Sequence, residues 1–324
     1  MVENDLLTNF IKMLECAAPL EVIRKIENDD DIDYSWNIFD SSGFLDILVA
    51  EKAGGAGLSL AAAAPLIEEL GAQLFPAPAA QTMMARALLT REGIEPPSGP
   101  ILLAGYNAVI PFAELAGHAL VAWQDKVNLI KINTTILRPM GLYGSRSAKL
   151  EFASAPEVLV SLLITPETLR ASAAVLRAAE IAGMAGDVLR MTVAYANERI
   201  QFGKPIGKQQ AIQQQLAILA EQALLARMAA RLGCAAGLPP TTEAAAAAKL
   251  VASASVPLVT NIAHAVHGAI GISEEYNLQL FTRRLYEARL ADGADGYWAT
   301  LLGARHLAGG AATSLDFVRA TSPV

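Results

Sequence analysis

Apolar residues recur every three or four positions over much of this 324-residue chain, which is the pattern of amphipathic helices. The first such run covers residues 6–14 and predicts a helix near the N-terminus. Ser41-Ser-Gly43 breaks the pattern, and a glycine loop follows at residues 54–58. Helical periodicity returns over 59–71 and again over 83–90. The first part of the chain therefore reads as a helical unit.

The sequence pattern changes from helical periodicity after the proline-rich segment 95–100, which has the composition of a linker. Short β-prone runs then follow one another, with turn residues between them. The runs cover residues 120–123, 127–132, 149–152 and 158–164, and the turns fall at 124–126 and 141–145. This part of the chain predicts a small sheet domain.

A helix is predicted to start at Thr165-Pro166-Glu167, because Thr can cap, Pro suits the first helical position and Glu suits the positive helix end. Its apolar stripe is rich in small residues, so a partner helix can approach closely. The stripe consists of Val175, Ala179, Ala182, Gly186, Leu189, Val193 and Ala196. The next helix repeats the pattern with Ile212, Leu216, Leu219, Ala223, Ala226 and Ala230.

Two more helices are expected over residues 243–267 and 293–309. Pro257 lies inside the first of them, where proline costs about 3 kcal/mol, so a kink or a boundary is expected there. Four long helices with short connections favour an antiparallel bundle. The predicted fold is mainly α, with an N-terminal helical domain (1–97), a reduced β domain (98–165) and a C-terminal four-helix bundle (166–324).

Composition supports a substantial core, since 53% of residues are hydrophobic and 18% are charged. The net charge of -7 argues against broad nucleic-acid binding, which needs a basic surface. The acidic run 27–33 contains no His or Cys, so it reads as a solvated loop rather than a metal site. No metal site is expected.

Two distant cysteines, Cys16 and Cys234, make neither a disulfide framework nor a zinc site. The N-terminus lacks the basic and apolar regions of a secretory signal. The mean hydropathy of +0.35 comes largely from alanine, and charged residues interrupt the alanine runs. We therefore expect a cytoplasmic protein without a membrane anchor, whose exposed apolar area is covered in an oligomer.

Residues 198–210 read Glu-Arg-Ile-Gln-Phe-Gly-Lys-Pro-Ile-Gly-Lys-Gln-Gln. They combine a fixed cation, an aromatic ring, glycines and amides on one turn between helices. These are suitable groups for a phosphate-bearing cofactor. The segment resembles the Arg-x-Gln-Phe-Gly signature of the acyl-CoA dehydrogenases. Residues 53–60 with 68–71, and residues 267–276 continuing to 292–293, resemble two further glycine-containing segments of that family.

The resemblance implies FAD as the cofactor, held across a subunit interface. Arg199 would bind the pyrophosphate of a neighbour's FAD, Phe202 would pack beside its adenosine part, and Gln210 would hydrogen-bond nearby. The full set of cofactor-binding residues that the resemblance implies is Arg199, Gln201, Phe202, Gly203, Gln210, His267 and Gly268. The simpler alternative is that Arg199 caps a helix end and Phe202 fills a gap in the core.

The implied reaction is α,β-dehydrogenation of an acyl-CoA thioester, in which a carboxylate removes the α-proton and FAD accepts a hydride. The resemblance brings Asp292 onto the position of the catalytic glutamate, although aspartate is one methylene shorter. The alternative for Asp292 is a loop-capping role before Gly293.

We expect Glu180 in a solvated or interface position, and Glu275 as a structural partner of Arg283 or Arg284.

The sheet domain is short and lacks the family's flavin-cradling segments, and Ala265, Ala269, Ala294 and Gly296 replace residues of the pattern. This combination resembles the short subunits of heteromeric acyl-CoA dehydrogenases of bacterial steroid side-chain degradation. It implies an acyl-CoA substrate, a second dehydrogenase subunit and an acceptor such as an electron-transfer flavoprotein. A complete homomeric dehydrogenase using Asp292, and a non-catalytic scaffold for a flavin-binding partner, remain open alternatives.

Overall fold

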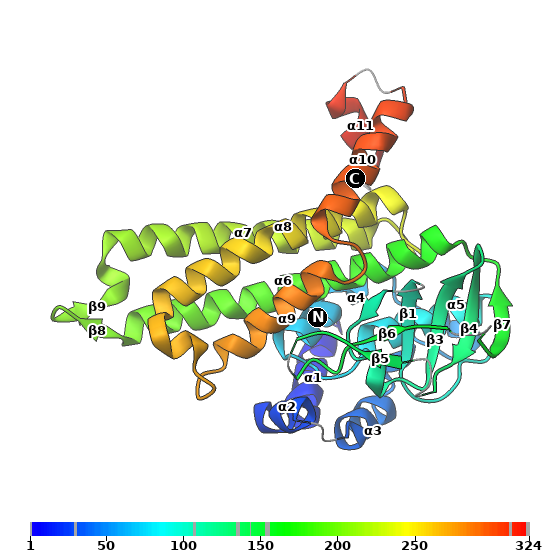
Figure 1. Cartoon of the computed structure of the whole chain (residues 1–324), viewed down its shortest axis with the longest axis horizontal. Coiled ribbons are helices and arrows are strands. Elements are labelled where there is room, and N and C mark those ends of the chain that lie inside the picture. The colour runs from blue at the N-terminus through cyan, green and yellow to red at the C-terminus, as the bar shows by residue number, and fades with distance from the viewer. Residues whose placement is uncertain are drawn as a thin grey trace.

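The computed structural model describes residues 2–28, 31–105, 108–133, 137–142, 144–152, 156–310 and 313–321. Short helices form the N-terminal part (Figure 1): α1 (Val2–Ala17), α2 (Leu20–Glu27), α3 (Asp33–Ser41), α4 (Leu60–Ala72) and α5 (Ala79–Arg91). Ser59 caps α4 by accepting a hydrogen bond from the Ala62 N–H. The helices predicted over 59–71 and 83–90 are α4 and α5.

Two small sheets follow. The four-stranded sheet has the order β1-β3-β4-β7, in which β1 and β3 run parallel and the other neighbours antiparallel. The three-stranded sheet has the order β2-β6-β5. The strands are β1 (Ile101–Gly105), β2 (Val109–Ile110), β3 (His118–Trp123), β4 (Lys126–Lys131), β5 (Leu137–Pro139), β6 (Ala148–Leu150) and β7 (Val158–Leu162). The sequence did not predict the strands β1, β2 and β5.

The C-terminal half is built on long helices (Figure 1): α6 (Pro166–Glu198), α7 (Gln210–Ala235) and α8 (Thr242–His267). Thr165 caps α6, as its sequence predicted, by accepting from the Thr168 N–H. α9 (Leu278–Leu290) packs on α6 and α8, and α10 (Asp295–Ala308) and α11 (Ser314–Thr321) project from one side. The predicted fold class, mainly helical with a small β domain, is confirmed; α9 was not predicted.

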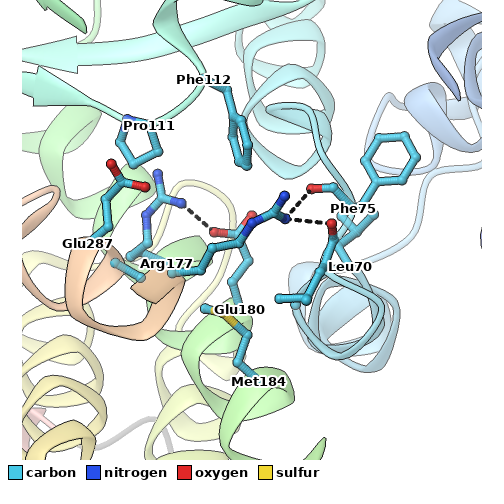
Figure 2. Close-up of a pocket in the computed structure, with 12 residues that line it drawn as sticks. Leu70, Phe75, Pro111, Phe112, Arg177, Glu180, Met184 and Glu287 are labelled. Atoms are coloured by element: carbon cyan, nitrogen blue, oxygen red, sulfur yellow. Dashed lines mark hydrogen bonds and ion pairs between the residues drawn. The ribbon is translucent and has the colours of Figure 1, made fainter. Parts of the chain in front are cut away.

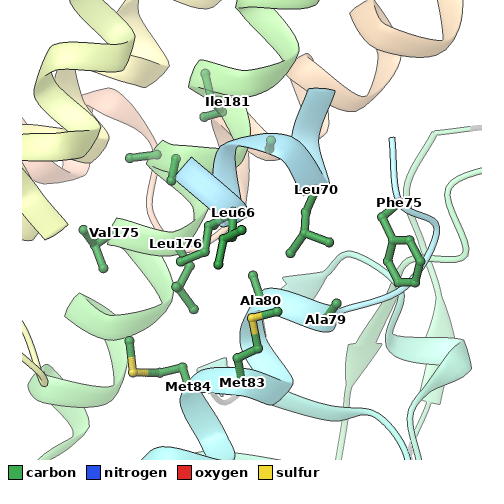
Figure 3. Close-up of a cluster of buried hydrophobic side chains, with 14 of the residues drawn as sticks. Leu66, Leu70, Phe75, Ala79, Ala80, Met83, Met84, Val175, Leu176 and Ile181 are labelled. Atoms are coloured by element: carbon green, nitrogen blue, oxygen red, sulfur yellow. The ribbon is translucent and has the colours of Figure 1, made fainter. Parts of the chain in front are cut away.

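The helices α4 and α6 cross in backbone contact. A Cβ on Gly183 would lie 1.8 Å from the Glu68 carbonyl oxygen, and one on Gly71 would lie 2.1 Å from the Glu180 carbonyl oxygen. Apolar side chains of α4, α5 and α6 surround this crossing, among them Leu66, Leu70, Met83, Met84 and Leu176 (Figure 3). The small-residue stripe of α6 does admit a partner helix, but at Gly183 rather than at the exposed Gly186.

α8 continues through Pro257, so of the two expected features the boundary is absent there. Two expectations from the sequence are corrected here. Glu27 is not solvated: its carboxylate accepts from Arg283 Nη2 at 2.8 Å and from Arg284 Nε at 3.2 Å. In the part of the chain that the structure describes, Glu27 pairs with both Arg283 and Arg284, whereas Glu275 is exposed. Asp29 and Asp30 of the acidic run lie outside the described residues.

One apolar segment, Thr242–Ile272, has the length and composition to cross a membrane. However, 61% of its most apolar window is buried inside the protein, where α8 packs against α6 and α7. Core helices of soluble proteins pass the same test. The segment is therefore weak support for a membrane span.

Candidate functional site

The signature segment forms a β-hairpin that projects from the end of the bundle (Figure 1). Its strands are β8 (Ile200–Gln201) and β9 (Lys204–Pro205), and Gln201 faces Lys204 across the pair. Phe202 and Gly203 form the two-residue tip with φ values of 53° and 75°. Positive φ at both positions is the geometry of a type I′ turn, in which glycine is favoured and a residue such as phenylalanine is uncommon. The tip therefore presents Phe202 in a fixed, uncommon conformation.

Phe202 is 90% exposed and Ile200 is 65% exposed. Arg199 and Gln210 are exposed as well, one at each end of the hairpin segment. Arg199 is the residue that follows α6, and its backbone N–H bonds to the Tyr195 carbonyl oxygen at 2.8 Å. The alternative that Phe202 fills a gap in this chain's core is therefore wrong. Both side chains are available to another molecule.

His267 and Gly268 lie at the C-terminal end of α8, near the base of the hairpin. The His267 ring is buried, stacks on Tyr195 with centroids 4.5 Å apart, and donates from Nδ1 to the Ala263 carbonyl oxygen at 2.8 Å. Burial lowers the pKa of His267, so the ring is neutral near pH 7. Gly268 has a φ of 64° and is exposed.

Asp292 is not free. Its Oδ2 accepts from Arg177 Nε at 3.1 Å, and Arg177 Nη1 donates to Glu180 Oε2 at 2.7 Å (Figure 2). The exposed fractions of the Arg177, Glu180 and Asp292 side chains are 7%, 15% and 9%. Glu180 was expected in a solvated or interface position. It instead lies inside the protein because Arg177 neutralises it.

This ion network changes the protonation of its members. Burial raises the pKa of Glu180, and the Arg177 guanidinium opposes that rise. Burial acts to lower the pKa of Arg177, but the two carboxylates outweigh it and hold the pKa above its ordinary value. Glu287 lies beside the network, and its pKa is raised by burial while its Oε1 accepts from Ser147 Oγ at 2.5 Å.

The loop between α9 and α10 holds Asp292 in place. Asp292 has a φ of 58°, and Trp298 Nε1 donates to the Asp292 and Gly293 carbonyl oxygens at 3.2 and 3.1 Å. Lys249 of α8 is fully buried, and its Nζ lies 2.8 Å from Ser253 Oγ, 2.9 Å from the Arg289 carbonyl oxygen and 3.0 Å from the Gly293 carbonyl oxygen. The loop is thus fixed by two buried side chains of neighbouring helices.

The space around the ion network is small. The cavity next to Arg177 and Glu180 holds about 30 Å³, room for little more than a water molecule (Figure 2). A cavity of about 250 Å³ lies on the other side of Asp292, between β1 and α6. A cavity of about 810 Å³, mostly apolar, lies between β2, residues 140–142 and α9.

The sequence pointed to Asp292 but not to Arg177 or Lys249. Arg177 stands three positions before Glu180, a spacing that places two side chains on one helix face. A charged pair inside an alanine-rich stripe was the available signal. Lys249 had no comparable signal, because the carbonyl groups that it binds come from residues 40 or more positions away.

Lys249 predicts a pH dependence of stability. Burial lowers its pKa to about 7, far below the ordinary lysine value of 10.5. Between these two pH values the unfolded chain binds a proton that the folded chain does not, so folding stability rises as pH rises. Urea unfolding at pH 7, 8 and 9 is expected to show this rise relative to Lys249→Met. Parallel pH curves for the two proteins would contradict it.

The hairpin and Asp292 lie far apart. Arg177, which contacts Asp292, precedes Arg199 by 22 residues on α6 (199 − 177). At 1.5 Å per residue the two positions are separated by about 33 Å along the helix. The hairpin and Asp292 therefore lie at widely separated places along the bundle.

Comparison with known proteins identifies the family of this chain. A family model described as "Acyl-CoA dehydrogenase, C-terminal domain" matches residues 168–307. The acyl-CoA dehydrogenase IpdE2 of Mycolicibacterium smegmatis is 30% identical over 295 residues, covering 88% of this chain and 92% of that protein.

Solved structures share the fold over nearly the whole chain. The Tcur3481-Tcur3483 steroid ACAD variant aligns with a TM-score of 0.84 at 21% identity, covering 96% of this chain and 100% of the other. The ChsE4-ChsE5 complex from Mycobacterium tuberculosis aligns with a TM-score of 0.78 at 19% identity, covering 94% and 97%. With the signature hairpin and the bundle that carries it, these matches establish that the chain belongs to the acyl-CoA dehydrogenase family, whose cofactor is FAD.

Proposed function

We propose that this chain is one subunit of a heteromeric, FAD-dependent acyl-CoA dehydrogenase, and that its hairpin completes a FAD site on the other subunit. One observation carries the proposal: the exposed hairpin and Asp292 are separated by about 33 Å along α6. The hairpin residues therefore reach outward to a cofactor that another chain holds.

The hairpin suits the adenosine end of FAD. The exposed Arg199 guanidinium can bind a diphosphate through two parallel hydrogen bonds. Phe202 offers a flat face to adenine, and the Gln210 amide lies at the other end of the segment. Gln201 and Gly203 on the hairpin, with His267 and Gly268 near its base, complete the proposed set. FAD, when bound, supplies the hydride acceptor of the dehydrogenation.

The catalytic base is proposed to come from the other subunit. A general base needs an open position beside the proton that it removes. Asp292 lacks one on the side of Arg177, because Arg177 occupies it at 3.1 Å and the adjoining cavity is about 30 Å³. In this role Asp292 is the counter-ion of Arg177. A homomeric enzyme that uses Asp292 would place the substrate in the cavity of about 250 Å³ that Asp292 lines between β1 and α6.

The acyl group is proposed to be bulky, of the steroid side-chain type. The support is the steroid ACAD with the same fold, together with a shortened sheet domain that leaves the cleft beside α9 wide. The electron acceptor is proposed to be an electron-transfer flavoprotein or a similar protein. The proposed location is the cytoplasm.

The test is co-expression with a candidate second dehydrogenase subunit, followed by measurement of bound FAD and of turnover. The chain alone is expected to carry little FAD, and the complex is expected to carry FAD and activity. Arg199→Ala in the complex is expected to weaken FAD binding by about 10- to 100-fold, the effect of a lost charged hydrogen bond. Arg138→Ala, an exposed arginine on β5, is the control and should leave FAD affinity unchanged.

Three outcomes separate the alternatives. Full FAD content and activity of the chain alone would contradict the heteromer. Loss of turnover in Asp292→Asn, with the complex and its FAD intact, would favour Asp292 as the base. Unchanged FAD affinity in Arg199→Ala would favour a scaffold that only stabilises its partner.

A further inference from the structure

The backbone is strained at two places beside the small cavity of Figure 2. Phe112, which follows β2, has a φ of 61°, and Leu74, which follows α4, has a φ of 52°. Bulky side chains rarely adopt this left-handed conformation. Such residues persist where their surroundings hold them, and they cluster at sites that bind ligands. Both residues line the small cavity, and both contact Arg284 of α9.

Arg284 holds the Phe112 ring in a defined position. The guanidinium carbon lies 5.2 Å from the centroid of the ring, which is a cation–π contact. Nη1 of the same arginine donates to the carbonyl oxygens of Leu74 and Phe75, at 2.5 and 3.4 Å. The Arg284 side chain is only 11% exposed. The ring therefore lies against a cation that the end of α4 fixes in place.

The segment that carries Phe112 separates two cavities. Pro111 and Phe112 line the cavity of about 30 Å³ (Figure 2). Val109, three positions earlier (112 − 109), lines the apolar cavity of about 810 Å³. Glu287 of α9 lines both cavities. Residues 109–112 and Glu287 thus form the partition between the wide cavity and the space inside the helices.

We infer that Phe112 determines the depth of the acyl site by closing the inner end of the wide cavity. The site then accepts a broad, short acyl group and excludes a long straight chain. This inference rests on the proposed function, which places the acyl group in the cleft beside α9. It adds the residue that selects between acyl shapes.

The space behind the ring would accept a chain if the ring were absent. Its wall on the α4 side is apolar and includes Leu70, Leu74 and Phe75. On the α6 side, Arg177 and Glu180 are paired with each other at 2.7 Å. Truncation of a large side chain leaves a cavity, and apolar cavities of about 150 Å³ bind a ring the size of benzene. The Phe112 ring is therefore the obstacle to a longer chain.

The test uses S-alkyl-CoA thioethers from S-butyl- to S-dodecyl-CoA, which lack the thioester carbonyl and are not dehydrogenated. Calorimetry measures their affinity for the co-purified complex. With the natural chain, affinity is expected to stop rising once the alkyl group reaches Phe112. Phe112→Ala is expected to extend the rise by about two further methylene groups, at about fourfold in affinity for each.

Phe112→Trp keeps the test decisive if the space opened by alanine collapses. Its larger ring is expected to end the rise in affinity at a shorter alkyl group. Phe44→Ala is the matched control, because Phe44 is a half-buried ring that packs on Phe10 at 4.7 Å in the N-terminal helices. It should leave the dependence on chain length unchanged.

Two outcomes overturn the inference, and they differ in what they say of the proposed function. If the thioethers bind the natural complex and their chain-length dependence is the same in Phe112→Ala and Phe112→Trp, the inference alone fails. If no thioether binds any form of the complex, the placement of the acyl group beside α9 fails and the inference fails with it.

Discussion

Arg177→Met is expected to destabilise the chain by about 3–5 kcal/mol, because it leaves the Asp292 and Glu180 carboxylates without their buried cation. Methionine has nearly the volume of the replaced side chain, so lost packing contributes little. Urea or thermal unfolding of the purified protein measures the loss. The cost arises from the unpaired charges rather than from the strength of the ion pair itself.

Two comparisons make this result specific. Arg190→Met is the control on the same helix: Arg190 is 70% exposed and pairs with Asp187 three positions away, so its loss should cost less than about 1 kcal/mol. Adding Asp292→Asn and Glu180→Gln to Arg177→Met should recover much of the stability, since both charges are then removed. An Arg177→Met protein as stable as the Arg190→Met control would contradict the role of the network.

Gly183→Val is expected to have the second large effect, a destabilisation of about 3 kcal/mol or more. Its Cβ would lie 1.8 Å from the Glu68 carbonyl oxygen, a backbone atom that a side-chain rotation cannot move. α4 would have to separate from α6, which opens the packed cluster of Leu66, Leu70 and Leu176 (Figure 3). Thermal unfolding measures the change.

Gly186→Ala is the matched control, one turn further along the same helix. A Cβ at Gly186 meets nothing within 4 Å, so alanine is expected to stabilise the helix by up to about 1 kcal/mol through its better helix propensity. Opposite signs for the two glycine positions are the expected result. A stabilised Gly183→Val protein would show that the two helices do not touch there.

The sequence predicted those parts of the fold that local pattern determines. Thr165 caps α6 as its residue type favours, and the predicted stripe of α7 from Leu219 to Ala230 faces the core as its periodicity indicates. The resemblance to a family signature drew attention to residues 198–210. The exposure of Phe202 in the structure then excluded a core role for that side chain.

The remaining features depend on residues that are far apart in the sequence. The partner of Asp292 is Arg177, 115 positions earlier, and Lys249 reaches two carbonyl groups 40 and 44 positions later. No periodicity encodes such pairs.

The separation of the hairpin from Asp292 along α6 links cofactor retention to subunit concentration. If residues of two chains together form one FAD site, FAD binds the assembled pair and not the free subunits. By mass action the cofactor then stabilises the assembly, and dilution of the assembly promotes release of the cofactor. Flavin fluorescence that rises on dilution, and falls again when fresh subunit is added, would be the visible sign of that linkage.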